Sequence, residues 1–471
     1  VTQLKGAPVL WITISMATDG GLWSLSVRRQ GSVPRLPPQR RIREQGTDAS
    51  VDIESLLRSM EDKKRDASLS AQRSIFRVPP TLRRHNGRAY RPDAFSIGLL
   101  HHGEERLKAA EGVKLHYAHD LMFRENVSLD DLTLAVSEIV DRARSSYAGA
   151  EFIKFDARKQ IEILVIDGCF LIETFYRNSL RATQMFLDDP FGSTPVLNML
   201  LMHDLLLLEN QMPWFVLERL FLLVYPSSSS RVLHDLALGF LELRFSYQEG
   251  SLPAIPPRRL SGILHLLDLL RRYVVSEEKK PAFRDFQKCV VQMPSAASLA
   301  DAGVTFRRGT IKNGLLNVEF HEGRGILEIP PILMDEFTEP LFRNLICFEQ
   351  SRWRTGCEGG FTSYAILMDK LINDARDVRI LCDSKIIDNW SAPEDVIQLF
   401  NRLYQDTAVF AFHYQPECEA IERYCDRRWP RWRAMYIRNY FSTPWAIASQ
   451  VVAAVLLTLT FLQTVYAMAN N

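Results

Sequence analysis

The chain has 471 residues, of which 46% are hydrophobic and 24% are charged, and its formal net charge is +1. This is the composition of a folded globular protein, and it excludes a chain that is disordered throughout. A nearly neutral chain also lacks the positive field that attracts nucleic acid, so we expect no nucleic-acid partner.

The seven cysteines argue against a disulfide framework. They are odd in number and show neither paired spacing nor a C-x-x-C motif. Small disulfide-bonded folds and zinc knuckles both depend on such spacing. We therefore expect reduced thiols, as in a cytosolic protein.

Residues 1–47 have the composition of a disordered extension. The basic, proline-containing run at 28–45 has too few apolar residues to fold. The apolar stretch at 7–17 is a poor secretion signal, because Thr13 and Ser15 interrupt it and no small-x-small cleavage site follows. Beyond the extension, apolar residues at helical spacing predict a short amphipathic helix: Ile53, Leu56, Leu57 and Met60.

Residues 48–436 are expected to form one helical domain, with a possible sub-domain boundary at the loops 226–231 or 249–257. Prolines and glycines punctuate 77–107, which predicts extended and turning backbone there. Helices are predicted from a capping box at Ser128 and Asp131 with an apolar face running to Ala143, and over 156–178.

A central buried helix is predicted at 196–208, because Pro195 is suited to its first turn and the run is apolar on nearly every side. Glu209, Asn210 and Gln211 follow this run and precede Pro213. We expect them to satisfy backbone groups where the helix breaks.

One β-hairpin is predicted, from strands at 315–320 and 325–329 joined by a glycine-bearing turn. Residues 340–436 return to helix, with a second capping box at Ser391 and Glu394. The predicted fold class is therefore mainly α: a large helical domain with one small β-hairpin and a single C-terminal transmembrane helix.

Residues 437–471 are expected to be a membrane anchor. No charged residue occurs from 439 to 471, and 445–468 supply about the 20 apolar residues that cross a bilayer core. The alternative, a buried core helix, rarely has this length without charge. The residues expected to mark the anchor, including rings at both boundaries, are Trp445, Val451, Leu456, Phe461 and Tyr466.

Basic residues gather on the N-terminal side of this segment, and they predict a single-pass protein whose body faces the cytosol. With little chain after the helix, insertion is expected to follow translation. The juxtamembrane basic residues, which also suit contact with an anionic leaflet, are Arg427, Arg428, Arg431, Arg433 and Arg438.

Histidines could suggest a metal site, but their pattern is weak. His101 and His102 precede Glu104, and His116 and His119 follow at helical spacing. A zinc site needs three or four convergent ligands, and H-x-x-H occurs by chance on many exposed helices. We therefore expect no metal and no cofactor.

Asp167 and Cys169 lie within an apolar helix, so both are expected to be buried. A buried carboxylate without a partner costs several kcal/mol, so we predict that Asp167 is held by an arginine or by backbone donors. The alternative is a nucleophile formed by Cys169 with His101 or His203, although burial would raise the pKa of the thiol. The motifs of common nucleotide-binding and hydrolytic sites are absent from the sequence.

Six successive segments resemble one plant family, known as domain of unknown function 247. They are RVPPTLRRHNGRAYRPDAFSIGLLHHG (77–103), IDGCFLIETF (166–175), HDLLLLENQMPWFVLERLF (203–221), NLICFEQ (344–350), YAILMDKLINDARDVRIL (364–381) and the apolar 444–467. The resemblance covers roughly residues 50–468 and departs at Leu99, where the family pattern usually has proline. The matching motif residues, expected to be structural, are His101, His102, Gly103, Asp167, Cys169, Glu209, Asn210, Gln211 and Glu349.

The resemblance implies a helical land-plant protein with one membrane helix and no established enzymatic activity. Some grass members resemble male determinants of self-incompatibility, which suggests recognition between pollen and stigma. The sequence therefore favours a membrane-anchored recognition or scaffold protein that binds another protein and is not an enzyme, with no residue assigned as catalytic. The alternative function is a hydrolase or transferase that uses His101 and His102 with Asp167 and Cys169.

Overall fold

The computed structural model describes residues 12–15, 24–27, 73–148, 153–180, 194–242, 260–275, 293–311, 314–352, 359–389, 391–409, 412–426 and 444–469. The chain divides into two compact units, Val1–Lys64 and Arg65–Asn471. The first contains an antiparallel pair of strands, β1 (Ile12–Ser15) and β2 (Ser24–Val27). The rest of the extension predicted at 1–47, and the helix predicted at 53–60, lie outside the described residues.

The segment from 77 to 107 is extended and turning backbone, as its prolines and glycines predict. It holds only short helical turns: α2 (Pro80–Arg83), η2 (Arg88–Tyr90) and the start of η3 (Glu105–Ala110). The segment is nevertheless largely buried, since Phe95 and Ile97 are at most 1% exposed. Its backbone groups therefore need partners inside the fold.

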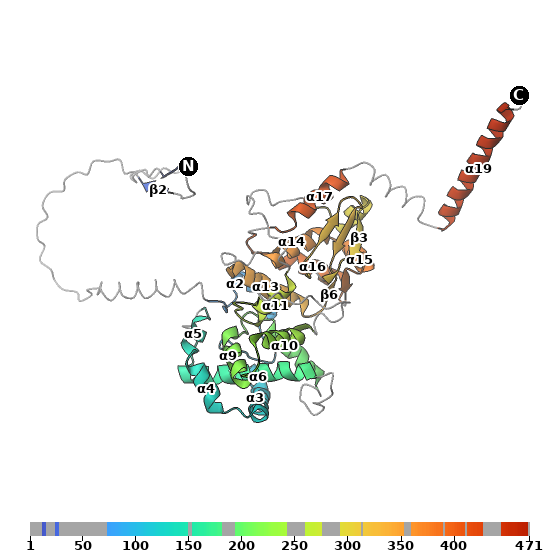
Figure 1. Cartoon of the computed structure of the whole chain (residues 1–471). Coiled ribbons are helices and arrows are strands. Elements are labelled where there is room, and N and C mark those ends of the chain that lie inside the picture. The colour runs from blue at the N-terminus through green and yellow to red at the C-terminus, as the bar shows by residue number, and fades with distance from the viewer. Residues whose placement is uncertain are drawn as a thin grey trace, which may run out of the picture. The chain divides into compact units, whose positions relative to one another are not determined.

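One group of helices surrounds α6 (Ala157–Leu180), which confirms the helix predicted at 156–178. Most of its middle residues are buried, because neighbours cover it on several sides (Figure 1). These neighbours are α3 (Glu111–Glu125), α4 (Leu129–Ser137), α5 (Val140–Ser145), α9 (Trp214–Val224) and α10 (Ser230–Glu242).

Two predictions in this group are confirmed only in part. The Ser128 hydroxyl accepts the backbone N–H of Asp131 at 3.1 Å and caps α4, but the expected face is divided between α4 and α5. The central helix predicted at 196–208 is α8 (Pro195–Leu205). Its beginning is exposed, with Val196 at 56%, whereas Leu201 and Leu205 are buried.

A second group of helices follows residue 260. Its helices are α11 (Leu266–Val274), α12 (Ala296–Asp301), α13 (Thr338–Arg352), α14 (Gly360–Leu371), α15 (Ala375–Asp383), α16 (Pro393–Leu403) and α17 (Gln415–Cys425). Both groups contribute to one hydrophobic core. The loop at 226–231 is a turn that leads into α10, and 249–257 lies outside the described residues.

Two small sheets accompany the second group. In one, β5 (Ile326–Ile329) lies between β4 (Glu319–His321), to which it is antiparallel, and β3 (Thr305–Arg308), to which it is parallel. In the other, β6 (Ile332–Met334) pairs in parallel with β7 (Ile387–Asn389). The predicted hairpin is thus confirmed as β4 and β5, but its first strand begins at Glu319 and not at the predicted residue 315. The strands β3, β6 and β7 were not predicted.

The capping box predicted at Ser391 and Glu394 is wrong. The residue that precedes the first turn of α16 is Ala392, which offers no capping side chain, and Pro393 begins the helix. Proline favours this first position, because its φ already fits the helix and it has no N–H to leave unsatisfied. A different capping box, at Asp374 and Asp377, begins α15.

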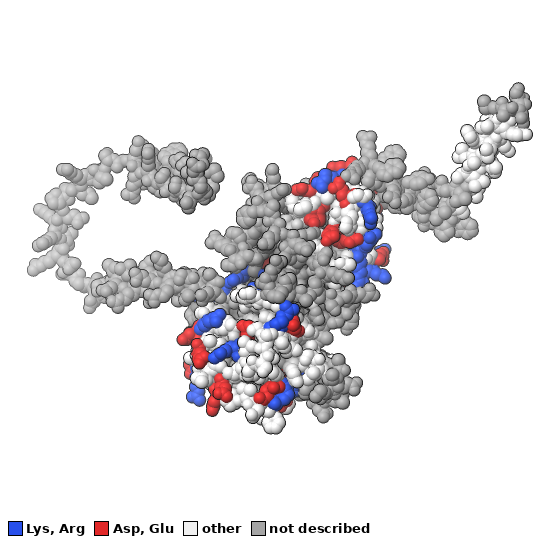
Figure 2. All heavy atoms as spheres, in the orientation of Figure 1, with Lys and Arg blue, Asp and Glu red and all other residues white. Residues whose placement is uncertain are grey.

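The C-terminal helix is α19 (Pro444–Ala469), and its described part carries no charged side chain (Figure 2). Large apolar side chains along it are exposed, including Leu457 at 73% and the expected anchor residues Leu456, Phe461 and Tyr466. The side chains of Trp445 and Val451, and the arginines at 427–438, lie outside the described residues.

The described residues form a mainly helical protein, which confirms the broad fold class. Among the helices of this described part, none is long and apolar enough to cross a membrane. The transmembrane span that was expected at 445–468 is therefore not supported by the structure.

Candidate functional site

The connection between α8 and α9 concentrates buried polar side chains. Asp204, Glu209, Asn210 and Gln211 are each at most 1% exposed. The Gln211 side-chain amide donates to the carbonyls of Leu205 and Leu207 at 2.7 and 3.0 Å, and that of Asn210 donates to the Asp204 carbonyl at 2.9 Å. These two side chains therefore supply hydrogen bonds to the carbonyls that α8 leaves free at its end.

The same connection holds the extended backbone at 93–98. The Asp204 carboxylate accepts the backbone N–H groups of Asp93, Ala94 and Phe95 at 2.7 to 2.8 Å. The Asn210 side chain accepts the N–H of Ile97 at 2.8 Å and donates to the Phe95 carbonyl at 2.9 Å. Because this backbone pairs with no strand among the residues that the structure describes, these side chains take the place of a sheet neighbour.

Glu209 and His101 form a second contact between the two segments. The Glu209 carboxylate accepts the backbone N–H of Val78 at 2.5 Å and pairs with Arg83, and its other oxygen lies 3.4 Å from Nε2 of His101. Burial alone would raise the pKa of Glu209, but His101, the Val78 N–H and Arg83 together lower it. His101 also contacts Glu104 at 2.6 Å through Nδ1.

Asp167 is held by a lysine and a backbone donor. Its carboxylate accepts from Nζ of Lys114 at 2.6 Å and from the N–H of Gly98 at 2.8 Å. Lys114 is completely buried and also pairs with Glu111 at 2.7 Å. Burial alone would lower the pKa of Lys114, but the carboxylates of Asp167 and Glu111 raise it, so this ammonium stays charged.

Lys114 was not predicted from the sequence, although its place on an apolar helical face indicated a buried charge. Lys114 precedes Tyr117, Ala118 and Leu121 by three, four and seven residues, and all three are buried. A charged residue on such an apolar helical face must find a partner in the core.

A pocket of about 290 Å³ opens beside this ion pair, and His102, Gly103, Glu111 and Asp167 contribute to its lining. The His102 ring packs edge-on against Phe155, with ring centres 5.4 Å apart. Burial lowers the pKa of His102, which favours its neutral form. Gly103 turns the chain here with φ of +84°. The structure thus brings three of the predicted motif residues, His102, Gly103 and Asp167, to one pocket.

Two other motif residues are wholly buried elsewhere. Cys169 is 0% exposed, and burial raises its pKa to about 12, so its thiol is protonated at neutral pH. Glu349 accepts the backbone N–H groups of Phe361 and Thr362 at 3.0 Å each. Since these residues begin α14, Glu349 of the preceding helix α13 caps its N-terminus from 12 residues before Phe361.

Comparison with known proteins places the chain among plant proteins. The family DUF247, described as plant protein of unknown function, matches residues 75–459. UPF0481 protein At3g47200 of Arabidopsis thaliana is 28% identical over 426 residues, which are 84% of this chain and 86% of that protein. Putative UPF0481 protein At3g02645 of the same plant is 22% identical over 484 residues, 83% of this chain and 89% of that protein.

No solved structure matches the chain. The match to the family covers the helical body described above and much of α19. The resemblance seen in the motif segments is therefore confirmed, and the chain belongs to the DUF247 family of plant proteins of unknown function.

Proposed function

We propose that this protein is a membrane-attached recognition protein whose helical body binds another protein, and that it is not an enzyme. The observation that carries the proposal is a line of exposed side chains on α3, formed by Leu115, His119 and Phe123. Leu115 is 53% exposed and Phe123 is 83% exposed. A four-residue spacing places all three on one face of the helix.

The geometry of this line favours contact with a protein. The His119 and Phe123 rings are stacked, with ring centres 6.4 Å apart and planes 10° apart, so the two side chains lie next to each other on this face. Exposed aromatic side chains are enriched at protein interfaces, where few such residues supply most of the binding energy. Leu115 also lines the pocket beside Asp167, so the line begins at a recess that a partner side chain can enter.

The chemical alternative has less support from the motif residues. Asp167 is engaged by Lys114 and Gly98, and His101 is engaged by Glu104 and Glu209. Cys169 is buried as a protonated thiol, which is a poor nucleophile. Side chains that are already held in ion pairs and backbone hydrogen bonds are typical of a stable binding scaffold, and they favour it over a hydrolase or transferase.

Membrane attachment through α19 is the second part of the proposal. Its support is the uncharged sequence from 439 to 471 and the exposure of apolar side chains along the described helix. The threonine hydroxyls of α19 are satisfied within the helix: Thr458, Thr460 and Thr464 each donate a hydrogen bond to the carbonyl four residues earlier at 2.8 Å. Exposed apolar side chains are favoured in an apolar environment, and a bilayer supplies one.

The arginines that precede α19 favour a body on the cytosolic side. We expect protease added to sealed, right-side-out vesicles to leave the body intact, and digestion from outside would reverse this orientation. A role in self-incompatibility, which the family resemblance suggested, stays a prediction.

The binding surface is tested by replacing Phe123→Ser in the full chain and comparing partners that co-purify in mild detergent from the source tissue. The matched control is Leu134→Ser, because Leu134 is 63% exposed but lies on α4. We expect at least one protein to be recovered with the wild type and the control but to be lost, by about tenfold or more, with Phe123→Ser. If every co-purifying protein is recovered equally with both variants, the face of α3 is not the binding surface.

A further inference from the structure

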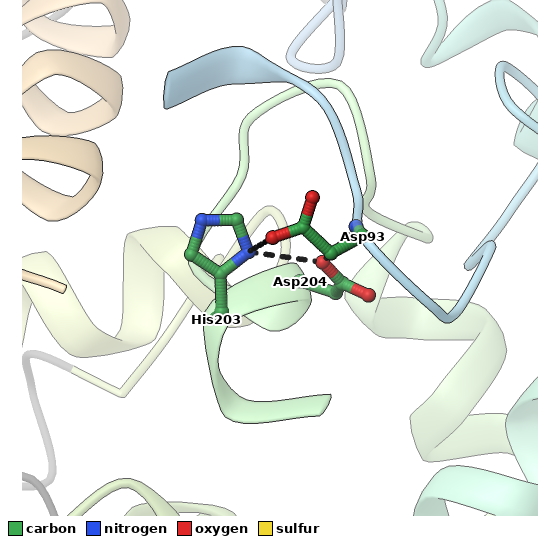
Figure 3. Close-up of side chains that lie close together, drawn as sticks. All are labelled: Asp93, His203 and Asp204. Atoms are coloured by element: carbon green, nitrogen blue, oxygen red, sulfur yellow. Dashed lines mark hydrogen bonds and ion pairs between the residues drawn. The ribbon is translucent and has the colours of Figure 1, made fainter. Parts of the chain in front are cut away.

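Asp93, His203 and Asp204 bring three potential metal ligands together (Figure 3). Nδ1 of His203 lies 3.0 Å from Oδ1 of Asp204 and 3.6 Å from Oδ2 of Asp93. The three ligand atoms lie within 4.8 Å of one another. Neighbouring ligands around a divalent metal with bonds near ~2.1 Å are separated by roughly 3 to 3.5 Å, so small side-chain rotations would suffice.

The backbone already orients two of these groups. The three N–H groups that donate to the Asp204 carboxylate belong to Asp93, Ala94 and Phe95. They fix the direction of the Asp204 side chain and, at the same time, hold the backbone of Asp93 beside it. Metal-binding carboxylates are commonly oriented by hydrogen bonds of this kind.

The third requirement of a metal site is access. Asp93 and His203 line an open cavity of about 530 Å³, and the Asp93 side chain is 60% exposed. The lining also carries three arginines, Arg88, Arg91 and Arg106, and two glutamates, Glu336 and Glu339, so the carboxylate of Asp93 brings its formal charge to zero. The cavity therefore offers an entry path and space for water on the side of the cluster away from Asp204.

We propose that Asp93, His203 and Asp204 form a binding site for a divalent cation, zinc or manganese, completed by water from the cavity. One imidazole nitrogen and two carboxylate oxygens are suited to these ions. A metal binds Nδ1 of His203 only when this nitrogen carries no proton, so the metal replaces the contact between Nδ1 and Asp204, and any proton on Nδ1 passes to water in the cavity. The two positive charges of the cation would also neutralise the carboxylates of Asp93 and Asp204, which both contact His203 in the structure.

The test measures cation binding by the full chain in mild detergent after treatment with a chelator. Zinc is titrated calorimetrically, and bound manganese is followed by loss of its free-ion electron paramagnetic resonance signal. The variants are Asp93→Asn and His203→Ala. The matched control is Asp141→Asn, which removes an exposed carboxylate from α5, away from the cluster.

We expect one equivalent of either cation to bind the wild type and to raise its thermal midpoint. Both site variants should weaken binding by about tenfold or more and lose the thermal shift, while the control keeps both. The proposal is overturned if the chelated wild type takes up neither cation, or if Asp93→Asn and His203→Ala bind as tightly as the control. Retained binding of that kind would assign the cation to other ligands, such as the cysteines.

Discussion

Asp167 and Lys114 form a pair in which each charge depends on the other. Both residues are at most 1% exposed, so removal of one leaves the other charge buried and unpaired. We predict that Asp167→Ala lowers the free energy of unfolding by roughly 3 to 5 kcal/mol. Denaturant unfolding in detergent measures this change.

The controls for this prediction separate charge from packing. Glu162→Ala removes a half-exposed carboxylate from the same helix, and its effect should stay within about 0.5 kcal/mol. Replacing Lys114→Met together with Asp167→Ala should recover much of the lost stability, since no charge is then stranded. An Asp167→Ala variant as stable as Glu162→Ala would show that the pair does not hold the fold.

His265 is a buried neutral histidine at the start of α11, where its Nδ1 accepts the backbone N–H of Asp268. Burial lowers its pKa to about 4. Between pH 6.5 and this value the unfolded chain binds a proton on His265 and the folded chain does not. Acidification over this range therefore favours unfolding, by a total of roughly 3 kcal/mol from this residue.

The expected result is a steeper loss of stability from pH 6.5 to 4 for the wild type than for His265→Asn, which keeps a capping side chain without this titration. Unfolding free energies measured across that range give the two slopes. Parallel curves for the two proteins would mean that His265 is not kept neutral by the fold.

At the scale of structural elements, the conformation of the backbone at 93–98 requires a glycine at position 98. Gly98 has φ of +74°, and a Cβ there would lie 2.3 Å from the Gln211 carbonyl oxygen. We predict that Gly98→Ala destabilises the protein by on the order of 2 to 4 kcal/mol, through backbone strain and this clash. Thermal unfolding with an independent denaturant titration measures the loss.

Gly112 provides the opposite case for the same substitution. It lies near the start of α3, and nothing is within 4 Å of a Cβ built there. Gly112→Ala should therefore stabilise the protein by roughly 0.5 to 1 kcal/mol, because alanine favours helix. Equal effects at the two positions would contradict the account of the 93–98 backbone.

The sequence predicted those elements whose signal is local. The periodicity of α6, the Ser128 cap and the turn between β4 and β5 are each visible within a few consecutive residues. In contrast, β6 and β7 are three residues long and are joined by pairing across more than fifty residues. Short strands of this kind lack a distinctive pattern until their partner is known.

The motif residues show the same limit. Their burial could be inferred from the apolar residues around them, but their partners could not. For Asp167 we expected an arginine or backbone donors. The structure instead places Lys114, 53 residues away, beside its carboxylate. The expected backbone donor is the N–H of Gly98. Likewise, the cluster of Asp93 with His203 and Asp204 joins segments separated by 110 residues or more and carries no sequence motif.

At the scale of the whole molecule, the described body and α19 have different surfaces. Lysines and arginines are interspersed with acidic residues over the visible helices of the body, whereas the described part of α19 has neither (Figure 2). A mixed charged surface is typical of a domain in water. The contrast supports the proposal that the two parts occupy different environments.

The most direct test of this account is membrane fractionation of the full chain beside a variant that lacks residues 440–471. After high-salt and alkaline carbonate washes, which remove proteins held by charge alone, we expect the full chain to stay in the membrane pellet and the variant to be in the supernatant. The variant must still elute as a folded species in gel filtration. A folded variant that stays in the washed pellet, or a full chain that the washes release, would contradict attachment through α19.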